Sequence, residues 1–103
     1  MAGNMQMMRQ LQKMQAEMMK VQEELGAKTV EATAGGGAVQ VTVSGHLEIK
    51  AVKIDPAAID PQDPGMLEDL VLAAVNEGLR KAQEMAGGAM ARFTGGLKIP
   101  GLF

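Results

Sequence analysis

Residues 5–25 read MQMMRQLQKMQAEMMKVQEEL, and this stretch decides how the fold begins. Its apolar residues are spaced alternately four and three positions apart, which is the heptad spacing of a helix with one apolar seam. The seam consists of Met7, Leu11, Met14, Met18, Val21 and Leu25. Because Gln, Lys and Glu at the remaining positions favour helix, the stretch predicts a long N-terminal helix that ends near Gly26.

The following segment, residues 28–54, predicts three short antiparallel strands. KTVEATA and AVQVTVSG flank the glycines at 35–37, an arrangement typical of two strands joined by a tight loop. The valines of AVQVTVSG alternate with polar residues, so this strand buries one face. A second turn at Gly45 and His46 leads into LEIKAVKI, where the alternation slips near Ala51 and indicates a bulge.

A second long helix is predicted after the loop DPAAIDPQDPG, with Asp63 as its N-cap and Pro64 at its first position. Apolar residues then recur at helical spacing until Gly87 and Gly88, which are expected to weaken or end the helix. The segment RFTGGLKIPGLF is expected to be extended, either mobile or docked on a partner.

The order of elements predicts an α+β chain, α-β-β-β-α, with a single dimerising domain over residues 1–94 and a flexible or docked tail over residues 95–103. A helix of about 20 residues is about 30 Å long, whereas strands of five or six residues span about 17 to 20 Å. The first helix must therefore extend beyond the sheet with its seam unburied, which indicates association. We expect a homodimer interface that contains the adaptable methionine-rich part of the seam, namely Met7, Leu11, Met14 and Met18.

Composition excludes several classes of function. The 103 residues contain no cysteine, so disulfides and thiolate chemistry are excluded. The apolar runs are too short for a membrane span or a signal peptide, so we expect a soluble, intracellular chain with no membrane partner. A net charge of −2 is not that of a strongly basic nucleic-acid binder, and two aromatic residues disfavour recognition by base stacking.

The residue pattern predicts no catalytic, metal or cofactor site. His46 is the only histidine, and its place in a turn favours an exposed structural role. Asp55, Asp60 and Asp63 have the oxygen chemistry of metal ligands, but each precedes a proline, so turns and helix caps explain them better. The glycine run lacks the GK[ST] ending of a phosphate loop and precedes a strand. We therefore expect no enzyme activity, no cofactor and no small-molecule substrate.

Basic residues on the first helix admit two interpretations. Arg9, Lys13 and Lys20 lie beside the seam, and Glu17 and Glu24 follow the two lysines by four positions. This spacing is typical of salt bridges on a solvated helix face. Residue chemistry alone favours that interpretation over a DNA-binding surface.

Four motifs follow one another along the chain: QLQKMQAEMMKVQEEL, VQVTVSGHLEIKAVKID, MLEDLVLAAVNEGLRKAQE and TGGLKIPGLF. Together they resemble the YbaB/EbfC family of bacterial nucleoid-associated proteins. The resemblance implies an intertwined homodimer with helices that project like tweezers. It also implies a cytoplasmic, nucleoid-located protein that binds double-stranded DNA with little sequence preference, alters its conformation, and affects nucleoid organisation and gene expression. Carried over by position, it nominates as DNA-binding residues Arg9, Lys13, Lys20, Arg80 and Lys81.

A second function remains open beside DNA binding. The chain would then be a protein-interaction adaptor that holds a partner in Met-rich helical grooves and with its apolar tail. The acidic balance keeps this alternative open, as do Ala16 and Glu17, which interrupt the basic stripe of the first helix.

Overall fold

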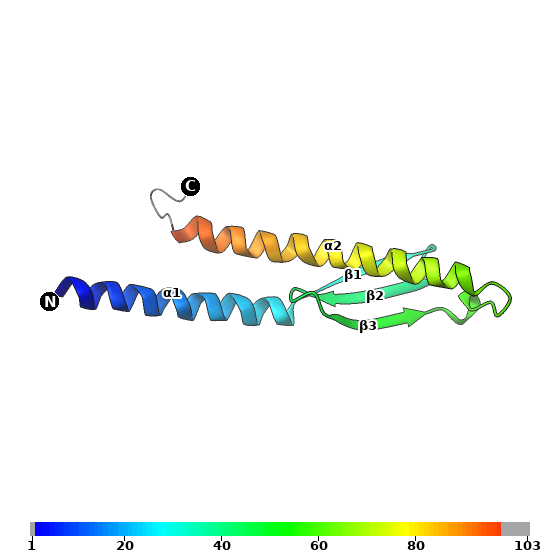
Figure 1. Ribbon diagram of the computed structural model, residues 1–103, viewed down its shortest axis with the longest axis horizontal. Coiled ribbons are helices and arrows are strands. Elements are labelled where there is room, and N and C mark those ends of the chain that lie inside the picture. Colours follow the sequence, from blue (N-terminus) through cyan, green and yellow to red (C-terminus); the bar gives the residue numbers. More distant parts are fainter. Residues whose placement is uncertain (1, 98–103) are drawn as a thin grey trace.

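The chain is strongly elongated, with both long helices extending past one end of a small sheet (Figure 1). The structure is a computed structural model that describes residues 2–97, with side-chain burial for residues 4–92. Its principal dimensions are 75 × 23 × 16 Å, and its radius of gyration is 20.3 Å. A compact domain of this length has a radius of gyration of about 13 Å. This shape leaves much apolar surface outside the chain's own core.

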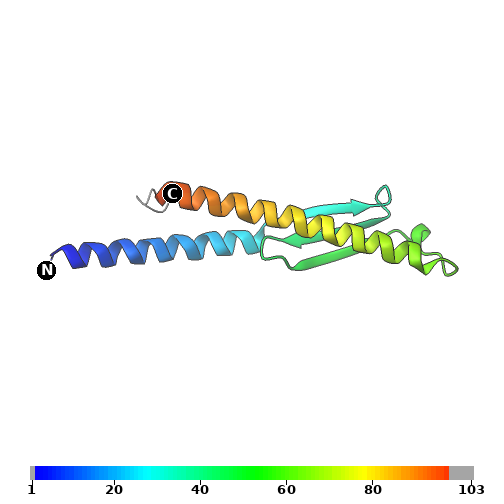
Figure 2. The same cartoon turned by 45° about the horizontal axis from the view of Figure 1, so that its top comes forward.

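Helix α1 (Ala2–Ala27) follows the predicted seam and ends one residue after Gly26. Its 26 residues make it about 39 Å long, and both ribbon views show it lying beyond the sheet (Figures 1 and 2). Along the seam, burial increases towards the sheet: Met7 and Leu11 are 61% and 55% exposed, whereas Leu25 is buried. The predicted overhang of the first helix is therefore confirmed.

The sheet consists of β1 (Thr29–Ala34), β2 (Val39–Ser44) and β3 (Ile49–Ile54), antiparallel and in the order β1-β2-β3. The glycine loop at 35–37 joins β1 to β2 with three consecutive positive φ angles of 65°, 68° and 97°. Side chains with a Cβ rarely adopt this conformation, which explains the run of glycines. Both the three-stranded meander and its glycine turn are as predicted.

A bulge lies between β2 and β3. Thr42 pairs with Ala51, whereas the next residue of β2, Val43, pairs with Ile49, so Lys50 is the extra residue of β3. This irregularity confirms the bulge predicted near Ala51. Because of the extra residue, Ile49 lies on the same face of the sheet as Val43 and Val52, although Ile49 and Val52 are three positions apart in the sequence.

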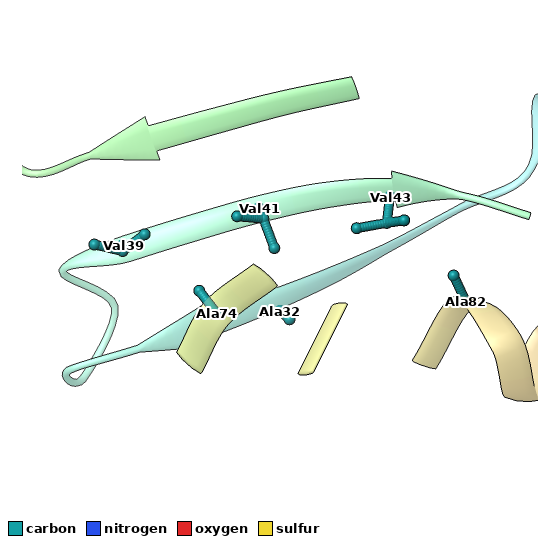
Figure 3. Close-up of a cluster of buried hydrophobic side chains, with 6 residues drawn as sticks. All are labelled: Ala32, Val39, Val41, Val43, Ala74 and Ala82. Carbon is teal, nitrogen blue, oxygen red and sulfur yellow. The ribbon is translucent and has the colours of Figure 1, made fainter. Parts of the chain in front are cut away.

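Helix α2 (Pro64–Leu97) follows the short 3-10 helix η1 (Pro56–Ala58) and packs across one face of β1 and β2. Small residues on the helix meet valines of the central strand in a narrow core, which comprises Ala32, Val39, Val41, Val43, Ala74 and Ala82 (Figure 3). A Cβ added to Gly78 would lie 2.8 Å from Val43 Cγ2 and 2.9 Å from Val41 Cγ2. The missing side chain therefore sets how closely α2 approaches β2.

The end of α2 differs from the prediction. The helix continues without interruption through Gly87 and Gly88 to Leu97, so the glycine pair does not end it, and the extended conformation expected from Arg92 onward is wrong as far as Leu97. Each glycine costs only about 1 kcal/mol relative to alanine, and good helix formers lie on both sides of the pair. The boundary predicted after residue 94 falls inside α2, and the rest of the predicted tail, residues 98–103, lies outside the described residues.

One part of the sheet remains uncovered on the side where α2 lies. Ile49, Val52 and Ile54 of β3 pair with the three core valines of β2 and therefore share their face. Because α2 packs mainly against β1 and β2, these side chains are 46%, 47% and 36% exposed. Leu72 of α2 is also 61% exposed, and an apolar depression next to it is lined by Leu67, Val71 and Val75. We call the exposed surface formed by Ile49, Val52, Ile54 and the neighbouring Leu72 the bare β3 face.

Candidate nucleic-acid interface

The three cations nominated on α1 lie on one side of the helix. Lys13 and Lys20 each precede a seam residue by one position, which is a rotation of about 100° around the helix axis. All three nominated side chains, including Arg9, are exposed. The seam itself turns towards α2 at its C-terminal end, where Val21 and Leu25 line a cleft together with Ala89. The basic side of α1 is thus rotated by about 100° from the seam that meets α2.

These cations have no anionic partner in the described part of the chain. The ion pairs found among residues 4–92 involve only Lys50 and Arg80. Lys13 does not pair with Glu17, nor Lys20 with Glu24, so the salt-bridged face expected from residue spacing is not formed. Unpaired, exposed ammonium and guanidinium groups are available for phosphate without first losing another partner.

Glutamines extend this basic surface towards the N-terminus. Gln6, Arg9, Gln10 and Lys13 line a shallow depression of about 370 Å³ on α1. Their spacing of i, i+3, i+4 and i+7 places them on one helix face. Glutamine side-chain amides donate hydrogen bonds to phosphate oxygens, as do other uncharged polar side chains. The spacing is visible in the sequence, but the DNA-binding residues nominated from the sequence are all charged and do not include Gln6 or Gln10.

Arg80 on α2 is engaged by two carboxylates. Its Nε donates to Glu77 Oε2 at 3.0 Å, Nη2 donates to Glu77 Oε1 at 2.6 Å, and Nη1 donates to Glu84 Oε1 at 2.6 Å. The hydrogen bond from Arg80 lowers the pKa of Glu77, and the same bond raises the pKa of Arg80. The positive charge of Arg80 is therefore compensated within its own helix.

Lys81 is held against the sheet. Its Nζ donates to the backbone carbonyl of Glu31 at 3.1 Å, and the residue is partly buried. The accepting carbonyl belongs to β1, the outer strand of the sheet on that side. The two basic residues nominated on α2 thus have partners within the chain, whereas the three on α1 have none among the described residues.

A second pair of cations lies where the helices run side by side. Lys28, just after α1, and Arg92 of α2 line a cleft of about 420 Å³ together with Glu24. The sequence pattern does not predict that these two cations are neighbours, because it places Arg92 in an extended tail and not in a helix beside α1. On the sheet, Lys50 pairs with Glu48 at 3.1 Å.

The acidic loop residues form helix caps and a turn, as predicted. The side chains of Asp55, Asp60 and Asp63 accept hydrogen bonds from the backbone N–H groups of residues 57, 62 and 66, respectively. Across the described residues, His, Asp and Glu form no cluster of three or more that could hold a metal ion. The helices found between residues 2 and 97 include none with the length and apolar character to cross a membrane.

Comparison with known proteins identifies the family. The chain belongs to the YbaB/EbfC DNA-binding family, whose sequence model matches residues 1–97. A nucleoid-associated protein of Pelotomaculum thermopropionicum is 60% identical over 104 residues, which cover 100% of this chain and 99% of the relative. A nucleoid-associated protein of Moorella thermoacetica is 58% identical over 100 residues, which cover 96% of each chain. The resemblance seen in the sequence motifs is confirmed.

A solved structure supports the fold. The crystal structure of an uncharacterized protein from Helicobacter pylori superposes with a TM-score of 0.76, covering 86% of this chain and 94% of the other. The two sequences are 21% identical, so the similarity concerns the arrangement of helices and strands.

Proposed function

We propose that this chain is a nucleoid-associated protein that binds double-stranded DNA as a homodimer, with little sequence preference, and alters the conformation of the DNA. Membership of a DNA-binding family supports the choice of partner, and the names of the bacterial relatives support a place at the nucleoid in the cytoplasm. The protein acts by binding and not by catalysis.

The observation that carries this proposal is the set of free cations on α1. Arg9, Lys13 and Lys20 are exposed and have no ion-pair partner among the described residues. At about 1.5 Å per residue they lie about 6 to 17 Å apart along the helix, which suits a phosphate backbone. Phosphate contacts position a protein on the duplex without reading its sequence, so low sequence preference follows.

A second copy of the chain supplies what one chain lacks. The exposed seam on α1 and the bare β3 face together leave more apolar surface open than a stable monomer is expected to expose. We place Met7, Leu11, Met14 and Met18 of one arm at the dimer interface and the bare β3 face against the partner's apolar surface. The dimer doubles the α1 cations, and two projecting arms hold one duplex and bend or stiffen it. Sedimentation should give twice the chain mass at micromolar concentration.

The test is fluorescence anisotropy with a labelled duplex across a salt series. We expect dissociation constants in the micromolar range that rise steeply with salt, because binding releases counterions from the neutralised phosphates. Replacing Lys13 and Lys20 with Gln keeps helix propensity and removes two charges from each protomer. Affinity should fall at least about tenfold at low salt, and the log–log salt slope should flatten by up to about 3.6, since each phosphate contact contributes about 0.9.

The matched control replaces Lys50 and Lys53 with Gln, which removes the same charge from the sheet. It should change affinity by no more than about twofold, because these side chains lie away from the α1 arm. Equal losses from both pairs would contradict binding through α1. If the wild-type protein binds no duplex even at low salt, the adaptor function is favoured, since Met5, Met7, Met8, Leu11 and Met19 are all exposed on α1.

A further inference from the structure

The turn between β2 and β3 lies against the C-terminal end of α1 (Figure 1). The Gly45 N–H donates to the backbone carbonyl of Leu25 at 2.9 Å and to that of Lys28 at 3.1 Å. Carbonyls at the end of a helix lack donors from their own helix. The turn therefore supplies, from another part of the chain, hydrogen bonds that a local C-cap usually provides.

His46 makes a second contact to the same helix end. Its imidazole Nε2–H donates to the backbone carbonyl of Gln22 at 2.7 Å. The ring also lies directly over Gly26, where an added Cβ would come within 2.9 Å of His46 Cε1. A Cβ on Gly45 would lie 2.5 Å from the Leu25 carbonyl oxygen. Both glycines are thus sites of close approach that fix the distance between turn and helix.

The turn itself has a defined, hydrogen-bonded conformation. Ser44 is fully buried, and its Oγ accepts hydrogen bonds from the N–H groups of His46 and Glu48 at 3.2 and 3.4 Å. Leu47 has a φ of 62°, an unfavourable backbone conformation for a residue with a branched side chain. Such a conformation persists only where the surroundings hold it in place. The turn is therefore a defined support for α1 and not a loose connection.

We propose that this turn sets the direction in which α1 leaves the sheet and that His46 is the positioning residue for the DNA-contacting arm. Apart from this joint, the described contacts of α1 are mainly with α2. Arg9 lies 17 residues from Gly26, or about 25 Å along the helix, so a tilt of about 10° at the joint displaces it by about 4 Å. A displacement of this size changes which phosphates the arm reaches. The consequence for DNA rests on the function proposed above, whereas the geometry of the joint does not.

The absence of cysteine makes the direction of α1 directly measurable. Spin labels are attached to Cys introduced at Gln6 on the arm and at Lys53 on the sheet, and the labelled chain is mixed with excess unlabelled chain to isolate the distance within one protomer. His46→Phe keeps an aromatic ring over Gly26 but removes the donor. Gln22→Ala is the matched control, because it removes a side chain and leaves the accepting backbone carbonyl.

We expect a single narrow distance distribution for the wild type and for Gln22→Ala. His46→Phe should broaden the distribution or change its mean, and should weaken DNA binding several-fold. A distribution for His46→Phe that superposes on the wild type would overturn the proposal, even if the melting temperature falls. If instead the distance changes but the wild-type protein binds no DNA, the joint stands and the proposed function fails.

Discussion

The two long helices contain similar residues and use them differently. On α1, Arg9, Lys13 and Lys20 are free of ion pairs in the described part of the chain, and the outer part of the apolar seam is exposed. On α2, Arg80 is held by two glutamates and Lys81 by the backbone of β1, while the apolar stripe packs in the core. One helix stabilises the sheet and the other remains available to partners. Charge count alone would have treated them as equivalent.

The largest expected effect concerns the packing role of α2. Gly78→Val places branched carbons where a single Cβ already lies within 2.9 Å of two core valines. Overpacking of this kind costs about 1–3 kcal/mol, and each kcal/mol lowers Tm by about 4–8 °C in a domain of this size. Gly87→Val in the same helix is the control, since nothing lies within 4 Å of a Cβ added there. Thermal unfolding of both variants should show a loss at residue 78 alone; equal behaviour would contradict the close approach of α2 to β2.

A smaller effect of opposite sign is expected where α2 leaves the sheet. Gly87→Ala combined with Gly88→Ala should stabilise the protein by about 1–2 kcal/mol, because alanine favours helix and added Cβ atoms meet no neighbour. Tm should rise and DNA affinity should remain unchanged. A fall in Tm would show that a second copy covers this face in the dimer. Partner contacts would then involve α2 as well as α1.

The smallest effect concerns Arg80 and tests whether its ion pairs with two glutamates are what keeps it from contacting DNA. Glu77→Gln with Glu84→Gln releases the guanidinium, whereas Glu31→Gln with Asp69→Asn changes the net charge equally at carboxylates without an ion pair in the described chain. Both double variants should bind DNA more tightly because the protein becomes less acidic. Because the DNA lies along α1, the first should gain no more than the second, as measured by anisotropy at low salt. A gain about two- to threefold larger from the first would mean that the released Arg80 reaches the DNA, which would contradict binding along α1 alone.

Local patterns predicted most of the fold. The seam on α1, the alternating valines of β2, the aspartate caps and the bulge near Ala51 depend on residues close together in the sequence, where spacing and turn chemistry determine the outcome. The end of α2 was mispredicted because two glycines carry a cost that the surrounding helix formers and the neighbouring α1 outweigh. Local rules describe what a segment prefers, and packing decides whether the preference prevails.

The candidate site was less predictable for the same reason. The pairing of Arg80 was readable, since Glu77 and Glu84 lie at i−3 and i+4. In contrast, Lys81 contacts a strand 50 residues earlier in the chain, and His46 contacts a helix 24 residues earlier. No spacing rule indicates such contacts. Likewise, the spacing of Lys13 and Glu17 allows a salt bridge, but it does not indicate that the two side chains stay unpaired in the structure.

The central claim is that DNA lies along α1 and not along α2. Lysine acetylation of the full-length protein, followed by mass spectrometry with and without duplex DNA at low salt, measures this residue by residue. We expect DNA to protect Lys13 and Lys20 strongly and to leave the reactivity of Lys53 and Lys81 nearly unchanged. Protection of Lys81 equal to that of Lys13, or uniform protection of all lysines, would contradict the assignment of α1 as the DNA-binding arm.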